Sequence, residues 1–314
     1  MSTKIFKNQE HQDLFDKQGF IVLPFLKEEE IEALNHYFFD NHKDFNESGF
    51  FSGSYSNDFD YKKRASDKVV EVFSRAYEAY FTNYKPFGGA FLYKIPGQNS
   101  ALPAHQDWTI VDEKNHVALN CWVPLCDITL ENGPIMIMPG SQASKHFVMR
   151  SPTLPFFFSG NDDVVMEELE PMTVKAGTAV ILNQSVIHYS PPNHSDKIRV
   201  AITAGVKSAD AVMHFHYKIP EQEKLEVFQM EDDFLIRFDD FFKDIKERPK
   251  MGKSVGEIPY TLPQYEREEL KKVIAKMKTN AGFELKTNVE TPQHDPKENK
   301  KNKGFLEKFL SFFK

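Results

Sequence analysis

The chain has 314 residues, and its 39 Lys and Arg against 46 Asp and Glu give a formal net charge of −7. Its composition, 40% hydrophobic and 27% charged, excludes collagen-like, coiled-coil and wholly disordered chains. The acidic balance argues against nucleic-acid binding, and two Cys exclude a disulfide framework. Because residues 1–18 show no secretory signal and no apolar run is long enough for a transmembrane helix, we expect a cytoplasmic protein.

Residues 1–85 predict a mainly helical part. Apolar residues recur at helical spacing in 27–43 and in 68–84, and acidic residues open the first of these segments. The segment 46–60 between them is rich in Gly, Ser and Asn, which predicts a loop.

Residues 86–218 predict a β core. Short alternating apolar runs are separated by Gly, Pro and Asn turns, and they predict strands at 89–95, 103–109, 117–125, 135–138, 172–175, 178–182, 186–189, 198–206 and 212–218. So many short strands favour an antiparallel sandwich or barrel. In the strand 117–125 the odd-numbered residues form an apolar face, and the other face, which includes Asn120 and Trp122, is suited to line a cavity.

Residues 219–285 predict a second helical part, with helices at 224–245 and 264–278. We expect residues 1–285 to form a single domain. The polar segment 286–303 predicts a disordered linker, and 304–314 predicts a short amphipathic helix. That helix has three alternative roles: a weak membrane-surface contact, a partner contact, or docking on its own domain.

A His-X-Asp pattern points to metal binding, because residues i and i+2 of a strand face the same way. The pattern occurs four times, and context separates the copies. His11/Asp13 and His42/Asp44 lie in polar helical segments, where such residues do not face each other. His194/Asp196 lies in a Pro-rich turn, and only His105/Asp107 lies at a predicted strand of the β core.

His188 and Arg199 are candidates to complete such a site. His188 follows the strand 178–182, far enough along the chain from His105 to have crossed several strands. Arg199 lies on a strand whose opposite face is apolar, and a buried Arg requires a partner. No Asp or Glu stands in the neighbouring predicted strands, so we expect the carboxylate of a bound ligand.

Two His and one carboxylate leave three coordination positions open, which is typical of non-haem Fe(II) oxygenases. A structural zinc site would close with four ligands, and Cys121 and Cys126 face opposite ways on their strand. We interpret both Cys as buried, inert thiols.

These residues resemble the phytanoyl-CoA dioxygenase family of Fe(II)/2-oxoglutarate oxygenases. The resemblance covers about residues 15–218 and rests on the order and spacing of short blocks: Gln18-Gly-Phe-Ile-Val-Leu-Pro24, Lys94-Ile-Pro-Gly97, His105-Gln-Asp-Trp108, Asn120-Cys-Trp-Val-Pro-Leu125, Glu131-Asn-Gly-Pro134, Met138-Pro-Gly-Ser-Gln142, and His188-Tyr-Ser-Pro-Pro-Asn193 followed by Arg199. One departure is Gln142, where many members carry His.

The resemblance implies a double-stranded β-helix, a jelly-roll barrel with flanking helices. It implies that His105, Asp107 and His188 hold Fe(II), that Arg199 pairs with the far carboxylate of 2-oxoglutarate, and that Trp122 and Asn120 line the co-substrate pocket. Since related halogenases lack the metal Asp, it implies hydroxylation of an unactivated C–H bond of a small molecule. Dioxygen would be consumed, and succinate and CO2 would be released.

Several alternatives remain open from the sequence. A non-catalytic jelly-roll that binds a carboxylate ligand or a metal is the rival function. Trp108 and Tyr93 are candidates to wall the substrate cavity or to pack in the core, and Lys94 is interpreted as a snorkelling surface residue. The segments 46–68 and beyond Val206 are candidate lids. The triplet at 62–64 predicts a solvated basic face, with phosphate binding as the alternative, and His214 and His216 predict hydrogen-bonded structure, with a second metal pair as the alternative.

Overall fold

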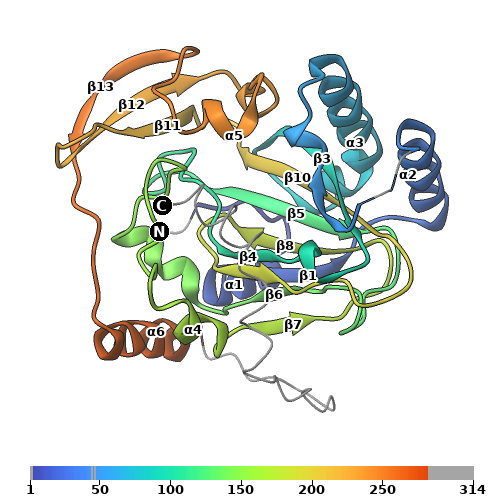
Figure 1. Ribbon diagram of the computed structural model, residues 1–314, viewed down its shortest axis with the longest axis horizontal. Helices are drawn as coiled ribbons and strands as arrows, with labels where there is room; N and C mark the ends of the chain where they lie inside the picture. The colour runs from blue at the N-terminus through green and yellow to red at the C-terminus, as the bar shows by residue number, and fades with distance from the viewer. Residues whose placement is uncertain (1–2, 44, 46, 282–314) are drawn as a thin grey trace.

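Eight consecutive strands form two facing sheets in the computed structural model, which describes residues 3–43, 45 and 47–281 (Figure 1). Each strand predicted between residues 86 and 218 overlaps an observed one. The eight strands are β3 (Tyr84–Ile95), β4 (Leu102–His105), β5 (Ala118–Pro124), β6 (Ile135–Ile137), β7 (Glu170–Met172), β8 (Thr178–Asn183), β9 (His188–Ser190) and β10 (Arg199–Ser208).

The strand order identifies the fold as a jelly-roll barrel, as predicted. The larger sheet has the order β1-β8-β5-β10-β3-β2, where β1 (Phe20–Pro24) and β2 (Gly49–Ser52) extend the core strands. The smaller sheet has the order β4-β9-β6-β7. All of these pairings are antiparallel, and the chain passes repeatedly from one sheet to the other, so side chains of both sheets meet in the space between them.

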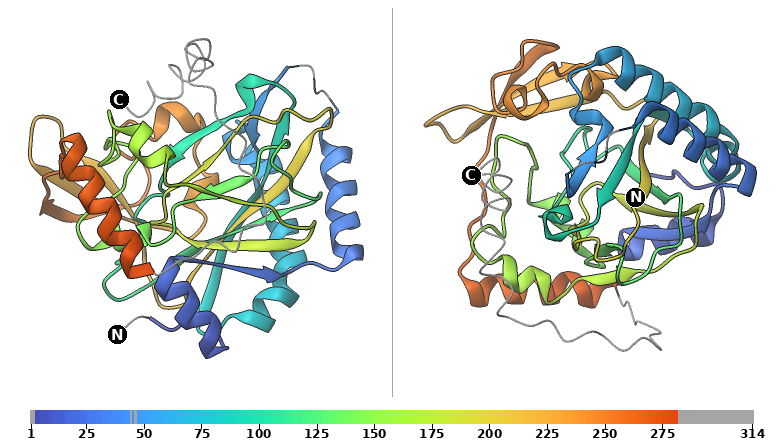
Figure 2. Two further views of the ribbon diagram at one scale, coloured as in Figure 1. Left: turned by 90° about the horizontal axis from the view of Figure 1, so that it is seen from below. Right: turned by 45° about the vertical axis from the view of Figure 1, so that its right-hand side comes forward.

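Helices near the N-terminus cover the outer face of the larger sheet (Figure 2). They are α1 (Gln9–Gln18), α2 (Glu28–Asn41) and α3 (Phe59–Tyr80). Their apolar residues, including Phe15, Leu34 and Phe73, form one core with Leu119 and Cys121 of β5. The predicted apolar face of this strand is therefore confirmed, and its other face points between the sheets.

Two helices cover the smaller sheet, α4 (Asp162–Met166) and α6 (Arg267–Ala281). Leu270 and Ile274 of α6 pack in one core with Ala104 and Ile187, which lie at β4 and just before β9. The layers thus run from the N-terminal helices through both sheets to α4 and α6 (Figure 2).

The region after residue 218 corrects the prediction of a helical C-terminal part. Its strands β12 (Lys224–Met230) and β13 (Lys253–Pro259) form a three-stranded sheet with β11 (Met213–Lys218), and the region also contains the short helix α5 (Phe241–Asp244). α6 matches the predicted helix 264–278, whereas the predicted helix 224–245 is replaced by β12 and, at its end, the short α5. The pairing of β12 shifts between Val227 and Phe228, so Leu225, Phe228 and Met230 are buried. An irregularity of this kind breaks the two-residue alternation of a strand and imitates helical spacing.

The N-terminal part also contains two short strands, β1 and β2, that the helical prediction did not include. Short 3-10 turns complete the description: η1 (Gly53–Tyr55), η2 (Gln98–Ser100), η3 (Ser141–His146) and η4 (Phe234–Ile236). The predicted linker 286–303 and helix 304–314 lie outside the described residues. Among the helices that are described, none combines the length and the apolar character needed to cross a lipid bilayer.

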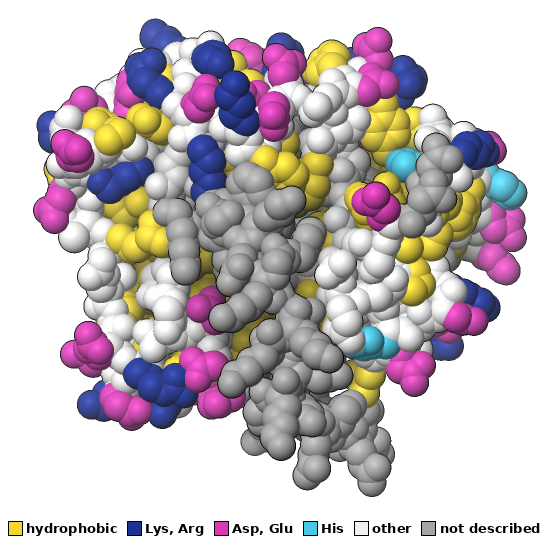
Figure 3. Space-filling view, viewed as in Figure 1, with side chains coloured by type: hydrophobic (Ala, Val, Ile, Leu, Met, Phe, Trp, Pro, Cys, Tyr) yellow, Lys and Arg dark blue, Asp and Glu magenta, His cyan; other side chains and the backbone are white. Residues whose placement is uncertain are grey.

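Basic and acidic side chains are interspersed around the margin of the face seen in Figure 3, where no extended patch carries a single sign of charge.

Candidate active site

His105, Asp107 and His188 meet at one edge of the smaller sheet. His105 ends β4 and His188 begins β9, and the register of these neighbouring strands places the two residues opposite each other. Their ring centroids are 4.1 Å apart. Asp107 follows two residues after His105, and the ligand atoms of all three side chains lie within 4.8 Å of one another. One metal ion can contact all three at this spacing.

The tautomers of both imidazoles are set by backbone carbonyls. Nδ1 of His105 donates to the Pro103 carbonyl at 2.7 Å, and Nδ1 of His188 donates to the Val186 carbonyl at 3.0 Å. Because a carbonyl oxygen only accepts, each neutral ring keeps its Nε2 lone pair for a metal. Burial, and next the neighbouring His188, hold the pKa of His105 well below its usual value, which favours the neutral ligand.

Asn120 orients the carboxylate of the triad. Its Nδ2 donates to Oδ2 of Asp107 at 3.4 Å, and its Oδ1 accepts from the Thr203 hydroxyl at 2.6 Å. Thr203 therefore fixes which way the Asn120 amide faces, with the donor toward Asp107. A metal ligand held from behind in this manner keeps its position before the ion arrives.

Arg199 lies buried between the sheets without a carboxylate partner. It is 2% exposed, and its Nε and Nη1 atoms have no hydrogen-bond partner within the described part of the chain. Its guanidinium carbon lies 5.6 Å from the centre of the Trp122 ring. Burial lowers the pKa of Arg199 to about 10, so the group is still charged at neutral pH. A buried charge with free donors fits an anionic ligand.

Lys94 is a buried neighbour of Arg199, which corrects its interpretation as a surface residue. The two are register partners on β3 and β10, and Lys94 is fully buried. Its Nζ donates to the Ser190 carbonyl at 2.9 Å and also to the Pro191 carbonyl. Burial, and then the charge of Arg199, hold the pKa of Lys94 well below its usual value. Both effects disfavour the cation until an anion enters.

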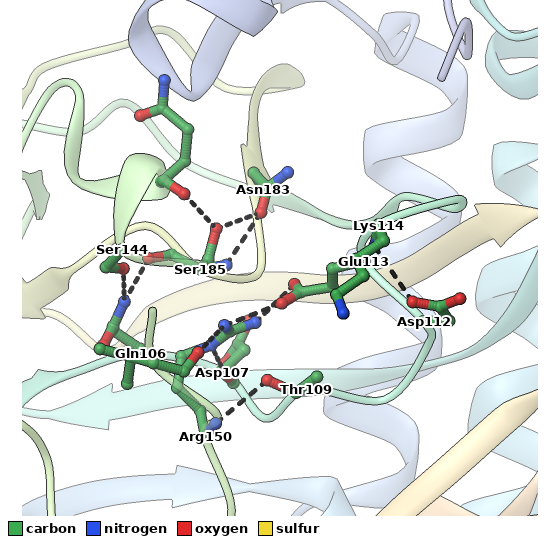
Figure 4. Close-up of polar contacts among 12 residues, drawn as sticks. Gln106, Asp107, Thr109, Asp112, Glu113, Lys114, Ser144, Arg150, Asn183 and Ser185 are labelled. Carbon is green, nitrogen blue, oxygen red and sulfur yellow. Dashed lines mark hydrogen bonds and ion pairs between the residues drawn. The ribbon is translucent and has the colours of Figure 1, made fainter. Parts of the chain in front are cut away.

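A buried ion pair supports the Asp107 segment from behind (Figure 4). Arg150 binds Glu113 through two nitrogens at 2.9 and 2.6 Å, and its Nε donates to the backbone carbonyl of Asp107 at 3.0 Å. The backbone of Arg150 exchanges hydrogen bonds with Thr109. The guanidinium thus fixes the chain on the side of Asp107 that faces away from the triad.

Gln106, which lies between His105 and Asp107 in the sequence, is buried and hydrogen-bonded on both sides of its amide nitrogen. Its Nε2 donates to the Ser144 hydroxyl at 2.8 Å and to the Ser185 carbonyl (Figure 4). Ser185 precedes Val186, the residue whose carbonyl holds His188. A single buried amide therefore connects the strand of His105 to the turn that carries the third ligand.

The triad and Arg199 share one cavity of about 280 Å³. Trp122 and Asn120 line it, as the strand pattern predicts, and so does Trp108. Tyr93 does not line it, and packs instead against Phe51 and the helix-facing core. Residues of both candidate lids line the cavity, among them Tyr55 and Phe241; that they select the substrate stays a prediction.

The other sequence candidates lie elsewhere. His216 donates through Nδ1 to the Thr109 carbonyl at 2.9 Å, which supports the structural interpretation of that pair. Lys62 is buried and donates to the Phe238 carbonyl at 2.5 Å, so the triplet 62–64 is not a uniformly solvated face. Both thiols are free, Cys121 buried and Cys126 half-buried, and burial raises the pKa of each.

Three groups of the site were missed by sequence reasoning. Thr203 stands four residues after Arg199 on the same strand face, so the alternation that identified Arg199 also indicates it. Arg150 and Tyr55 give no local signal, because their partners are distant in the sequence.

Comparisons with known proteins were made for the whole chain. The sequence model of the family described as "Phytanoyl-CoA dioxygenase (PhyH)" matches residues 15–201. The chain is 30% identical over 126 residues to "Phytanoyl-CoA dioxygenase domain-containing protein 1" of Mus musculus, and 27% identical over 129 residues to "Phytanoyl-CoA dioxygenase" of Arabidopsis thaliana. Each match covers 38% of this chain and 43% of the relative, so the chain matches less than half the length of either.

One solved structure with a similar fold is EvdO2 from Micromonospora carbonacea var. aurantiaca complexed with 2-oxoglutarate. It is 19% identical, with a TM-score of 0.47, and the match covers 67% of this chain and 94% of that one.

Proposed function

The chain belongs to the phytanoyl-CoA dioxygenase family, and on that premise we propose that it is an Fe(II)- and 2-oxoglutarate-dependent dioxygenase that hydroxylates an unactivated C–H bond of a small molecule. One observation carries the proposal: an open triad of two His and one Asp shares a cavity with a buried Arg that lacks a carboxylate partner. Such a triad leaves metal positions open for a co-substrate and dioxygen.

The charged residues of the cavity and Trp122 have proposed roles. His105, Asp107 and His188 hold the iron, and Arg199 pairs with the far carboxylate of 2-oxoglutarate. The Trp122 ring lies beside the guanidinium, its centre 5.6 Å from the guanidinium carbon. When bound, iron and 2-oxoglutarate supply the oxidising chemistry with dioxygen, which converts 2-oxoglutarate to succinate and CO2 and a substrate C–H group to an alcohol.

Residues of the chain set the conditions for that chemistry. Asn120 donates to one oxygen of Asp107, which leaves the other oxygen directed to the metal. The carbonyls of Pro103 and Val186 keep the His rings neutral and oriented. The proposed catalytic unit is the single domain predicted at 1–285, since the cavity takes side chains from all three of its parts, for example Phe50, His105 and Phe241.

Anaerobic titration of the full-length protein with Fe(II) and then 2-oxoglutarate tests this proposal. We expect a visible metal-to-ligand charge-transfer band, which requires 2-oxoglutarate to chelate the iron. The band should be lost in His188→Ala, and in Arg199→Met it should need far more 2-oxoglutarate. Folded wild-type protein that binds Fe(II) but gives no band would contradict the proposal. A band without succinate formation in any substrate screen would favour the non-catalytic, carboxylate-binding alternative.

A further inference from the structure

The cavity has a second end that the metal and the co-substrate do not use. We call it the aromatic end and define it by Tyr55, Phe87, Trp108, Phe241 and Phe242, which all line the cavity. Trp108 stacks on Phe241 with ring centroids 6.0 Å apart and planes 11° apart. The Tyr55 ring lies 4.8 Å from Phe241 and 4.7 Å from Phe242.

The backbone makes room for one of these rings. A Cβ atom on Gly205 of β10 would lie 2.0 Å from Cε2 of Phe87, so the Phe87 ring occupies space that any other residue at 205 would fill. Gly205 also pairs with Asn120, the residue that orients Asp107. The aromatic end therefore begins directly beside the triad.

Charged side chains are confined to the other end. Among the described residues that line the cavity, the Asp, His and Arg side chains are those of His105, Asp107, His188 and Arg199, and Lys and Glu do not occur. The proposed function uses all four. No charged group is left to neutralise a charge on a second molecule, and a buried charge without a partner is very costly.

The size of the cavity sets a further limit. Its volume of about 280 Å³ lies just below the roughly 300–1,000 Å³ that is usual for small-molecule pockets. This space also has to hold 2-oxoglutarate. A bulky substrate can therefore place only a part of itself inside.

From these observations we propose that the substrate enters the aromatic end with a small, uncharged and hydrophobic part, and that any charged group of the same molecule stays outside the cavity. This inference rests on the proposed function, which assigns the four charged residues to iron and 2-oxoglutarate. Tyr55 adds one neutral polar group. Burial raises the pKa of its hydroxyl, and the nearby Asp107 raises it further, so the group remains a hydrogen-bond donor.

The two Trp of the chain make this testable without knowing the substrate. Both line the cavity, Trp108 at the aromatic end and Trp122 beside Arg199. Energy transfer from Trp to a bound fluorophore therefore reports occupancy of this space. Two matched probes are N-phenyl-1-naphthylamine, which is neutral, and 8-anilino-1-naphthalenesulfonate, which carries a sulfonate on the same ring system.

The probes are titrated into the full-length protein in the presence of Fe(II) and saturating 2-oxoglutarate, without oxygen. We expect the neutral probe to bind at least about tenfold more tightly than the sulfonate. Because both Trp line the same cavity, energy transfer to this probe should fall partly in Trp108→Phe and partly in Trp122→Phe. Phe241→Glu should weaken the neutral probe by about tenfold or more, and Phe241→Leu is the matched control with an apolar side chain.

Equal or tighter binding of the sulfonate would overturn the inference, as would unchanged binding of the neutral probe in folded Phe241→Glu. If that variant does not fold, the comparison of the two probes in wild-type protein, with the two Trp variants, still decides the matter. Failure of the proposed function is seen separately, as the absence of the charge-transfer band, whereas a preference for the sulfonate while the band is present contradicts this inference alone.

Discussion

The two ends of the cavity are built from different parts of the fold. At the polar end, the proposed metal ligands and Arg199 stand on or next to β4, β9 and β10, and hydrogen bonds from behind hold them in place. At the aromatic end, the rings of Tyr55, Phe241 and Phe242 come from η1 and α5, outside the two facing sheets. The proposed chemistry thus rests on the barrel, whereas three of the five rings of the proposed substrate surface stand on flanking segments.

The largest effect is expected from removing a ligand at the polar end. His188→Ala should abolish substrate-dependent succinate formation, because two remaining ligands hold iron weakly. His194→Ala, a change in the loop between β9 and β10, is the matched control and should keep wild-type turnover. Full turnover in the His188 variant would remove this residue from the proposed triad.

The second-largest expected effect is a loss of stability at acidic pH, caused by His216, whose ring donates to the Thr109 carbonyl. Burial lowers the pKa of His216 to about 4, so the folded protein protonates this residue at a lower pH than the unfolded chain does. The stability that neutral His216 contributes is complete above pH 6.5, the usual His value, and is lost as the pH falls toward 4. The loss should be on the order of 3 kcal/mol. Urea unfolding across this range measures it, and His216→Asn should flatten the dependence.

Next in size is the co-substrate contact. Arg199→Met should raise the KM for 2-oxoglutarate by about 100-fold, because charge-assisted hydrogen bonds to the far carboxylate are lost. Turnover at saturating 2-oxoglutarate should fall much less. Arg199→Lys keeps the charge without the planar fork, so its KM for 2-oxoglutarate should lie between those of the wild type and of Arg199→Met. An unchanged KM in the Met variant would exclude Arg199 as the carboxylate ligand.

The smallest effect is expected from the support behind Asp107. Arg150→Lys keeps a positive charge near Glu113 but loses the paired hydrogen bonds and the donation to the Asp107 carbonyl. Iron affinity should fall by about tenfold, as is usual for groups that orient a metal ligand. Arg237→Lys, at an exposed ion pair with Asp233, is the control. Equal iron affinity in both variants would show that the Arg150 pair supports only the fold.

The polar end could largely be predicted from the sequence, and the aromatic end could not. Strand alternation and turn residues placed His105 and Arg199, because in a barrel the side-chain direction follows directly from the residue parity. Lys94 was placed wrongly, since its burial depends on the neighbouring strand β10 and on the carbonyls near Ser190. In general, the pattern of one strand says which face a residue takes, but not which groups it meets there.

Aromatic residues illustrate the remaining limit. The chain contains 29 Phe, 11 Tyr and 2 Trp, and nothing in the local sequence separates Phe241 from those that fill the core. Its contact with Tyr55 joins segments at opposite ends of the domain. The irregular pairing at Val227 and Phe228 makes β12 look helical, so most of the predicted helix 224–245 is wrong, although Phe241 itself lies in the short helix α5.

The central position of β10, between β5 and β3, has a consequence for the order in which the protein assembles. Ala201 pairs with Pro124 on one side and Leu92 on the other, so the larger sheet cannot close before the ribosome has released these late residues. In the same way, Phe20 of β1 cannot pair with β8 until Leu182 has been synthesised. Such long-range pairings fold slowly and leave strand edges open to aggregation in the meantime. A nascent chain that stops short of Arg199 therefore holds every proposed iron ligand and yet has no closed barrel to keep them together.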